Sequence, residues 1–147
     1  GHGEHVDLDD ALAMGRAPDG GLFVPESLPN HDYRSWTAQS PSEVAAIYLA
    51  PFFAESKLRD SLPAIAAETF NFPLPVEPVS VAEGEAAVLE LFHGPTAAFK
   101  DVGARFLAAC LTRLKTTDHD ITILVATSGD TGGAVAAAFH GRPAVVG

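Results

Sequence analysis

An almost unbroken apolar run extends from Ile121 to Ala126. Such a run is typical of a strand buried on both faces of a parallel sheet, which needs helices on either side. The elements expected around it are a strand at 88–92, a helix from Lys100 or Asp101 to Leu114, a turn at 127–131, a helix at 132–139 and a strand at 144–146. This alternation predicts an α/β unit with parallel strands and right-handed crossovers.

The first half of the chain is predicted to be mostly helical. Asp7 is placed to cap a first helix. Ser40, Pro41 and Glu43 form a typical helix start, with a serine cap, a proline in the first turn and a glutamate at the capping-box position. The helices expected are 7–16, Ser40 toward Glu55 with a kink at Pro51, and about 61–69.

Turn-forming residues divide the rest of the first half. A turn at 19–21 is followed by a short strand at 22–24, which Pro25 stops. The proline-rich segment 72–78 is interpreted as a connection between domains. We therefore expect a mostly helical N-terminal domain at 1–75 and the beginning of an α/β domain, incomplete, at 76–147.

Composition indicates a folded protein with an acidic surface. The chain is 47% hydrophobic and 19% charged, so it can bury a core. Its net charge of −10 argues against non-specific binding to nucleic acid or to an anionic membrane. No apolar stretch is long enough to span a bilayer, and the first residues lack the pattern of a secretory signal.

The single cysteine, Cys110, excludes an internal disulfide and fits a reducing, cytoplasmic setting. It lies in an apolar run, so a buried small hydrophobe is favoured over a nucleophile. The chain does not begin with Met and stops within an apolar run that is interpreted as the start of a strand. We therefore expect it to be part of a longer chain.

Lys100 is the lysine with the most unusual surroundings. It follows Ala97-Ala98-Phe99 after a Gly-Pro turn, whereas Lys57 and Lys115 have polar neighbours. Desolvation favours the neutral amine, which can attack a carbonyl and hold it as a Schiff base. The alternative is a lysine at a helix start whose methylene stem covers apolar surface.

A second candidate site is the loop from Thr127 to Gly133, predicted to follow the carboxyl end of a strand and to open a helix. Free N–H groups there attract a carboxylate or phosphate, and Thr127, Ser128 and Thr131 add hydroxyl groups. Gly129 allows a close backbone approach. The alternative is an ordinary turn capped by Ser128 or Asp130. The loop lacks the Gly-Lys-Ser/Thr ending of a Walker A motif.

The other residue patterns are weaker. Asp130 would repel an anion, so it is expected to cap the helix or to accept a hydrogen bond from a phenol or protonated imine. The six histidines show no metal-ligand spacing, and no metal site is expected. His93 is favoured as a residue that orients the turn before Lys100, with a role in the site as the alternative.

Three segments together resemble a known enzyme family. Residues 89–101, which contain Phe92-His93-Gly94-Pro95-Thr96 and Phe99-Lys100-Asp101, resemble the cofactor-lysine segment of threonine synthases, which are fold type II pyridoxal-phosphate enzymes. Residues 126–132 resemble the Asp-containing form of that family's Ser-Gly loop, and residues 19–25 its N-terminal segment. The resemblance implies the start of that fold's three-layer parallel-sheet unit, and covers only the N-terminal portion of the family's chain.

The resemblance also implies roles for individual residues. Lys100 would bind pyridoxal 5'-phosphate as a Schiff base and then move protons at the substrate carbons. Asp130 would lie near the cofactor's phenolic oxygen, and Phe99 would help to shape the pocket. The substrate α-carboxylate would be held by Thr127, Ser128, Gly129 and Thr131. The implied reaction converts O-phospho-L-homoserine and water to L-threonine and phosphate. The family's cofactor-phosphate loop lies downstream, so residues 1–147 alone are expected to be inactive.

Three other functions remain open at this point. A phospholyase or an amino-acid dehydratase of the same superfamily would release a keto acid. A non-catalytic relative of threonine synthase would bind cofactor or a partner without turnover. An unrelated nucleotide-binding α/β domain would leave Phe99-Lys100-Asp101 without a purpose.

Overall fold

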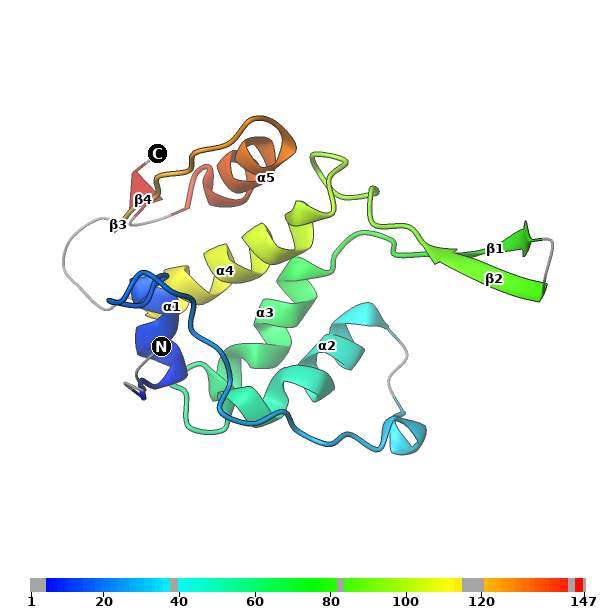
Figure 1. Cartoon of the computed structure of the whole chain (residues 1–147), viewed down its shortest axis with the longest axis horizontal. Helices are drawn as coiled ribbons and strands as arrows, with labels where there is room; N and C mark the ends of the chain where they lie inside the picture. Colours follow the sequence, from blue (N-terminus) through cyan, green and yellow to red (C-terminus); the bar gives the residue numbers. More distant parts are fainter. Residues whose placement is uncertain (1–4, 38–39, 82–83, 115–120, 143–144, 147) are drawn as a thin grey trace.

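The computed structural model describes residues 5–37, 40–81, 84–114, 121–142 and 145–146 (Figure 1). The α-helices are α1 (Leu8–Met14), α2 (Pro41–Leu49), α3 (Leu62–Thr69), α4 (Lys100–Leu114) and α5 (Asp130–Phe139). The strands are β1 (Val76–Val81), β2 (Gly84–Leu89), β3 (Ile121–Thr122) and β4 (Val145–Val146), and 3-10 helices occur at η1 (Tyr33–Ser35), η2 (Ala50–Phe53) and η3 (Arg59–Ser61). The mixed α/β class and the mostly helical first half are confirmed.

The predicted helix starts are confirmed by their caps. The Asp7 carboxylate accepts a hydrogen bond from the backbone N–H of Asp10 at 2.8 Å, at the start of α1. The Ser40 hydroxyl accepts one from Glu43 at 3.3 Å, at the start of α2. Helix α2 ends at Leu49 and continues as the 3-10 turn η2, which contains Pro51, because proline cannot donate the bond that an α-helix needs there.

The predicted strand at 22–24 is wrong. These residues follow the predicted turn, in which Gly20 N–H bonds to the carbonyl of Ala17, but they join no sheet in the described structure. Leu22 and Val24 are about four-fifths exposed. Their apolar character favours a strand, but an extended segment without a neighbour to pair with remains a loop.

Strands β1 and β2 form an antiparallel hairpin that extends away from the helices (Figure 1). Val76 pairs with Leu89, and Val81 with Gly84. The predicted connection at 72–78 and the predicted strand at 88–92 are therefore corrected: β1 begins inside the first, and β2 ends three residues before the end of the second. Both strands of a two-stranded hairpin are edges, which is where a proline such as Pro78 is tolerated.

The predicted strand at 121–126 is correct only at its start. In the described residues β3 pairs in parallel with β4, Ile121 with Val145 and Thr122 with Val146, and has no other neighbour. Leu124 is 90% exposed, so this segment is not buried on both faces. A ladder of two residue pairs cannot hold the rest of the apolar run in a strand. The predicted strand at 144–146 is confirmed at Val145–Val146, and Ala144 lies outside the described residues.

Helix α4 lies at the centre of the packed body, with α1, α3 and α5 against it (Figure 1). Of its predicted apolar side, Cys110, Leu111 and Leu114 are buried, whereas Leu107 is exposed and Phe106 only partly buried. The buried alanines of α4, Ala104, Ala108 and Ala109, lie in the core instead, and their small side chains let the helix axes approach closely. The buried cluster comprises Phe53, Leu58, Leu62, Ile65, Ala104, Ala108, Ala109, Cys110, Leu111, Leu114, Ala134, Ala138 and Phe139. The division of the chain at residue 75 stays a prediction.

A charged cluster joins the ends of three helices. The Glu68 carboxylate of α3 contacts Arg113 of α4 at 2.9 Å and Arg142, just after α5, at 2.6 Å. Burial raises the pKa of the Glu68 carboxyl, but hydrogen bonds from Arg142 and Arg113 outweigh it, so that the pKa lies below its ordinary value. The cluster therefore holds α5 against the α3–α4 pair at neutral pH.

Candidate active site

Lys100 and Asp130 meet at the starts of two packed helices. Lys100 opens α4 and Asp130 opens α5, and these helices lie side by side (Figure 1). The Lys100 Nζ donates a hydrogen bond of 2.8 Å to Asp130 Oδ2, although the residues are 30 positions apart. The structure thus brings together the two motifs that the sequence singles out.

The pair has one lysine amine and one carboxylate, both reachable from solvent. The side chain of Lys100 is 30% exposed and that of Asp130 is 56% exposed. The hydrogen bond from Lys100 is the main cause that keeps the pKa of the Asp130 carboxyl below its ordinary value, with smaller contributions from the Lys100 charge and the Thr131 backbone N–H. Asp130 is therefore an ionised acceptor at neutral pH.

Phe99 also contacts the lysine. Its ring centroid lies 4.0 Å from Lys100 Nζ, within the range of a cation–π interaction. Phe99 as a whole is 60% exposed. The apolar turn before Lys100 therefore supplies an accessible aromatic ring beside the amine.

Thr127 shapes the Ser-Gly loop from within. Its hydroxyl oxygen accepts hydrogen bonds from the backbone N–H groups of Gly129 and Gly132, both at 3.2 Å. The helix cap is Gly129, without a side-chain cap bond, so the alternative in which Ser128 or Asp130 caps α5 is wrong. Thr127, two positions before Gly129, supplies the cap instead, because its hydroxyl oxygen accepts the N–H of Gly132 in the first turn of α5.

The remaining residues of the predicted anion site lie at the start of α5. Ser128 and Gly129 are exposed, and Thr131 is half-buried as the second residue of α5. Gly129 has an extended backbone (φ −178°), so the turn itself does not require glycine there. Gly132 is different: a Cβ added to it would lie 2.3 Å from Cγ2 of Thr127.

Sequence reasoning missed Asp101 and Gly132. Asp101 is 1% exposed, and its carboxylate accepts hydrogen bonds from the backbone N–H and hydroxyl of Thr96. The signal available was an acidic residue in a first helical turn, six residues after a Gly-Pro pair. For Gly132 the signal was a second glycine beside Gly133 inside a helix.

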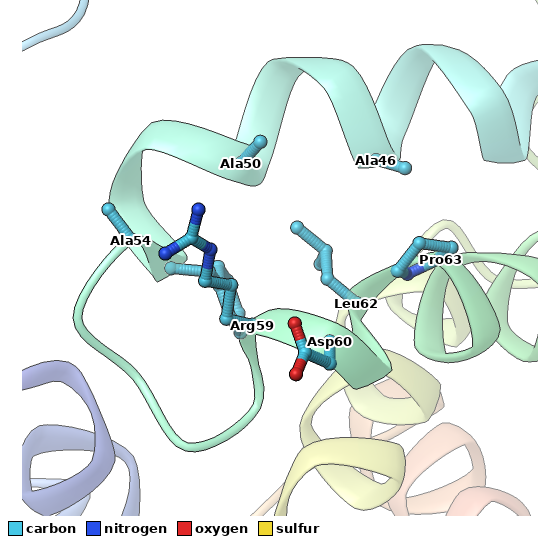
Figure 2. Close-up of a pocket in the computed structure, with 8 residues that line it drawn as sticks. Ala46, Ala50, Ala54, Arg59, Asp60, Leu62 and Pro63 are labelled. Atoms are coloured by element: carbon cyan, nitrogen blue, oxygen red, sulfur yellow. The ribbon is translucent and has the colours of Figure 1, made fainter.

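Two further features lie outside this constellation. His93 Nε2 makes a 2.6 Å hydrogen bond with Glu90 rather than with any candidate site residue. A cavity of about 440 Å³ between α2 and α3 contains none of the candidate residues (Figure 2). It is lined by Ala46, Ala50, Phe53, Ala54, Arg59, Asp60, Leu62 and Pro63.

In the described part of the chain, no three His, Cys, Asp or Glu side chains gather to hold a metal ion.

The chain resembles known proteins at the levels of family, sequence and structure. The family described as "Threonine synthase N terminus" matches residues 1–70. Threonine synthase of Escherichia coli is 40% identical over 147 residues, 98% of this chain, and its crystal structure superposes with a TM-score of 0.83. Over its whole length the chain is similar to the N-terminal portion of threonine synthases. A PLP-bound threonine synthase of Brucella melitensis is 35% identical, covers 99% of the chain and has a TM-score of 0.85.

The similarity to threonine synthases covers only the front part of these relatives. The chain spans about a third of the length of the curated and solved relatives it matches: 33% for Escherichia coli and 32% for the Brucella melitensis structure. "Threonine synthase-like 2" of Xenopus laevis is 36% identical over 137 residues, 86% of the chain and 28% of that relative. Threonine synthase relatives thus include one that bears only a "-like" name. No helix within the described residues is long and apolar enough to cross a membrane.

Proposed function

We propose that this chain supplies the cofactor-lysine and carboxylate-binding part of a pyridoxal-phosphate-dependent threonine synthase. The reaction converts O-phospho-L-homoserine and water to L-threonine and phosphate. The observation that carries the proposal is the contact between Lys100 and Asp130, because it joins the two motifs in which the chain resembles the family. The identity of 35% to a solved threonine synthase named as PLP-bound supports the cofactor.

Lys100 is assigned the covalent attachment of the cofactor and the movement of protons at the substrate carbons. Its side chain fits this role by position, because it is partly exposed and its Nζ is oriented by the Asp130 carboxylate 2.8 Å away. When bound, pyridoxal phosphate supplies an electron sink for carbanions next to the substrate nitrogen. Asp130 would lie near the cofactor's phenolic oxygen and would accept a hydrogen bond there. Phe99 presents an accessible aromatic ring beside them.

The loop that opens α5 is assigned the substrate α-carboxylate. Thr127, Ser128, Gly129 and Thr131 are the residues proposed. The Thr127 oxygen already accepts two backbone N–H groups, so only its proton is available; that proton faces the Gly129 carbonyl over a long 3.4 Å contact. A carboxylate is a stronger acceptor than a carbonyl and can take that proton. Thr127 therefore both builds the loop and donates to the ligand.

The remaining assignments follow from the same proposal. The partner is a small-molecule substrate, not nucleic acid or a membrane, and the setting is the cytoplasm, in keeping with the single buried cysteine. Residues 1–147 alone are proposed to be inactive, since the matched relatives are about three times longer. Threonine formation by the isolated segment, lost in Lys100→Ala, would contradict that last point.

A second candidate is elimination of phosphate from a related substrate without threonine formation. It is kept as a candidate because the chain is also 36% identical to a relative of Xenopus laevis that is named only "Threonine synthase-like 2". Product analysis separates the two. Purified full-length protein is incubated with cofactor and O-phospho-L-homoserine, and phosphate, threonine and keto acid are quantified. Threonine equal to phosphate supports the synthase, and keto acid equal to phosphate supports elimination. Phosphate release unchanged in Lys100→Ala would reject both.

A further inference from the structure

We propose that Asp101 is a positioning residue for Lys100: its buried carboxylate clamps the Gly94–Ala97 turn and so sets where α4 begins and where the lysine amine lies. The inference rests on the proposed function for the role of Lys100. It adds a residue that touches neither cofactor nor substrate in that proposal.

The first observation is a buried carboxylate whose hydrogen bonds, within the described residues, both come from Thr96. Asp101 is 1% exposed. Its Oδ2 accepts the backbone N–H of Thr96 at 2.9 Å, and its Oδ1 accepts the Thr96 hydroxyl at 2.7 Å. Burying a carboxylate is costly unless hydrogen-bond donors satisfy it. The donors here belong to Thr96, so the carboxylate of Asp101 fixes the turn that leads into α4.

The second observation is that the turn is fitted to this carboxylate. A Cβ at Gly94 would lie 2.5 Å from Asp101 Oδ2 and 2.9 Å from its Cβ, so only glycine lets the two approach. Ala97 has φ 56°, a left-handed conformation that is unfavourable for a residue other than glycine. Its N–H bonds to the Gly94 carbonyl at 3.1 Å, closing the turn. A strained residue persists only where its surroundings hold it.

The third observation is the place of Lys100 between two fixed points. The backbone of the next residue, Asp101, is held by its own side chain and by an N–H bond to the Ala98 carbonyl at 3.0 Å. The amine at the other end of the side chain is held by Asp130. If the turn relaxes, the start of α4 moves, and the amine no longer meets Asp130 at hydrogen-bond distance.

The experiment uses the full-length protein and variants of Asp101. Asp101→Ala removes both acceptors, whereas Asp101→Asn keeps the size and one acceptor, so it should rescue. The matched control is Asp9→Ala. Asp9 is also a buried carboxylate, 5% exposed, and binds Ser56 and the Lys57 N–H, away from Lys100. Both sites lose a buried carboxylate, but only one is proposed to move the lysine.

Two readouts are measured, and neither is turnover. The first is the titration of the Asp130 carboxyl by carbon NMR without cofactor; its pKa should rise toward the ordinary value in Asp101→Ala only. The second is the rate at which pyridoxal phosphate and borohydride label Lys100, relative to Lys57. That ratio should fall by roughly 10- to 100-fold in Asp101→Ala, since small displacements have such effects on reacting groups. In Asp101→Asn and Asp9→Ala it should stay within about threefold of the parent.

The outcomes separate this inference from the proposed function. A folded Asp101→Ala protein with an unchanged Asp130 titration and labelling ratio would overturn the inference. If Asp101→Ala does not fold, Thr96→Val removes one of the two bonds and is held to the same two readouts in the same directions. If the parent never labels at Lys100, the proposed function fails, while the Asp130 titration still decides whether Asp101 positions the lysine.

Discussion

The amine of Lys100 lies 2.8 Å from the carboxylate of Asp130, and each residue is the first of its helix. The contact joins α4 to α5 at one end, while Glu68, with Arg113 and Arg142, joins them to α3 elsewhere. Asp130 contacts a lysine that is proposed to react, whereas Glu68 contacts two arginines. Changes at Asp130 should therefore affect the candidate site, and changes at Glu68 should affect stability.

Lys100→Met should raise the pKa of the Asp130 carboxyl toward its ordinary value. The lysine hydrogen bond holds that pKa down, so the contact stabilises the fold above the ordinary carboxyl pKa, and this stability is lost as pH falls through the lowered value. Because both groups are exposed, the effect on overall stability should be small. Carbon NMR titration measures the shift, with Lys57→Met as the control. An unmoved Asp130 titration would mean that the pair does not form.

Gly132→Ala should disrupt the loop, and Gly133→Ala should not. A Cβ at Gly132 meets Thr127 at 2.3 Å, whereas one at Gly133 has nothing within 4 Å. We expect the first change to cost about 1–3 kcal/mol and the second to stabilise by up to about 1 kcal/mol, as alanine does in helices. Urea unfolding of both variants provides the comparison. Equal stabilities would show that the loop adjusts freely.

Glu68→Gln should destabilise the protein by about 1 kcal/mol at neutral pH, because two arginines lose their charged partner. The pKa of Glu68 is lowered in the fold, so its contribution is present above the ordinary glutamate pKa and disappears as pH falls through the lowered value. Urea unfolding at pH 7 and near pH 3 tests this. The difference between parent and variant should shrink at the acidic pH, and a constant difference would contradict the assignment.

Cys110 should be unreactive in the folded protein. Burial raises the pKa of its thiol from 9.0 to about 12, so thiolate is scarce at neutral pH. Because the folded pKa is above the unfolded one, this group's contribution to stability is complete below about pH 9 and is lost as pH rises toward 12. A thiol reagent at pH 8 should label Cys110 only after denaturant is added. Rapid labelling of the native protein would show that α4 is not packed as described.

Local signals predicted the helices well. Asp7, Ser40 and Pro51 act within a turn of their own position, so their caps and breaks can be read without the rest of the chain. Strands failed where pairing decides. Leu22–Val24 and 123–126 have apolar residues suited to strands but no partner among the described residues, whereas the segment with Pro78 found one across a hairpin.

The same distinction holds for the site. The sequence motifs identify Lys100 and Asp130 as candidates. Their contact arises only because α4 packs against α5. Asp101 could not be found from its own position, because its burial and its bonds to Thr96 depend on how the turn folds back. The Thr127 oxygen was assigned to a ligand, and its two bonds within the loop became visible only in three dimensions.

The central claim is that Lys100 is the residue that binds pyridoxal phosphate. The most direct measurement is intact mass and peptide mapping of the full-length protein after incubation with the cofactor and borohydride, alongside Lys100→Ala. We predict one cofactor per chain, found on the peptide that contains Lys100, and none in the folded variant. A cofactor on Lys57 or another lysine, or equal labelling of folded Lys100→Ala, would contradict the claim.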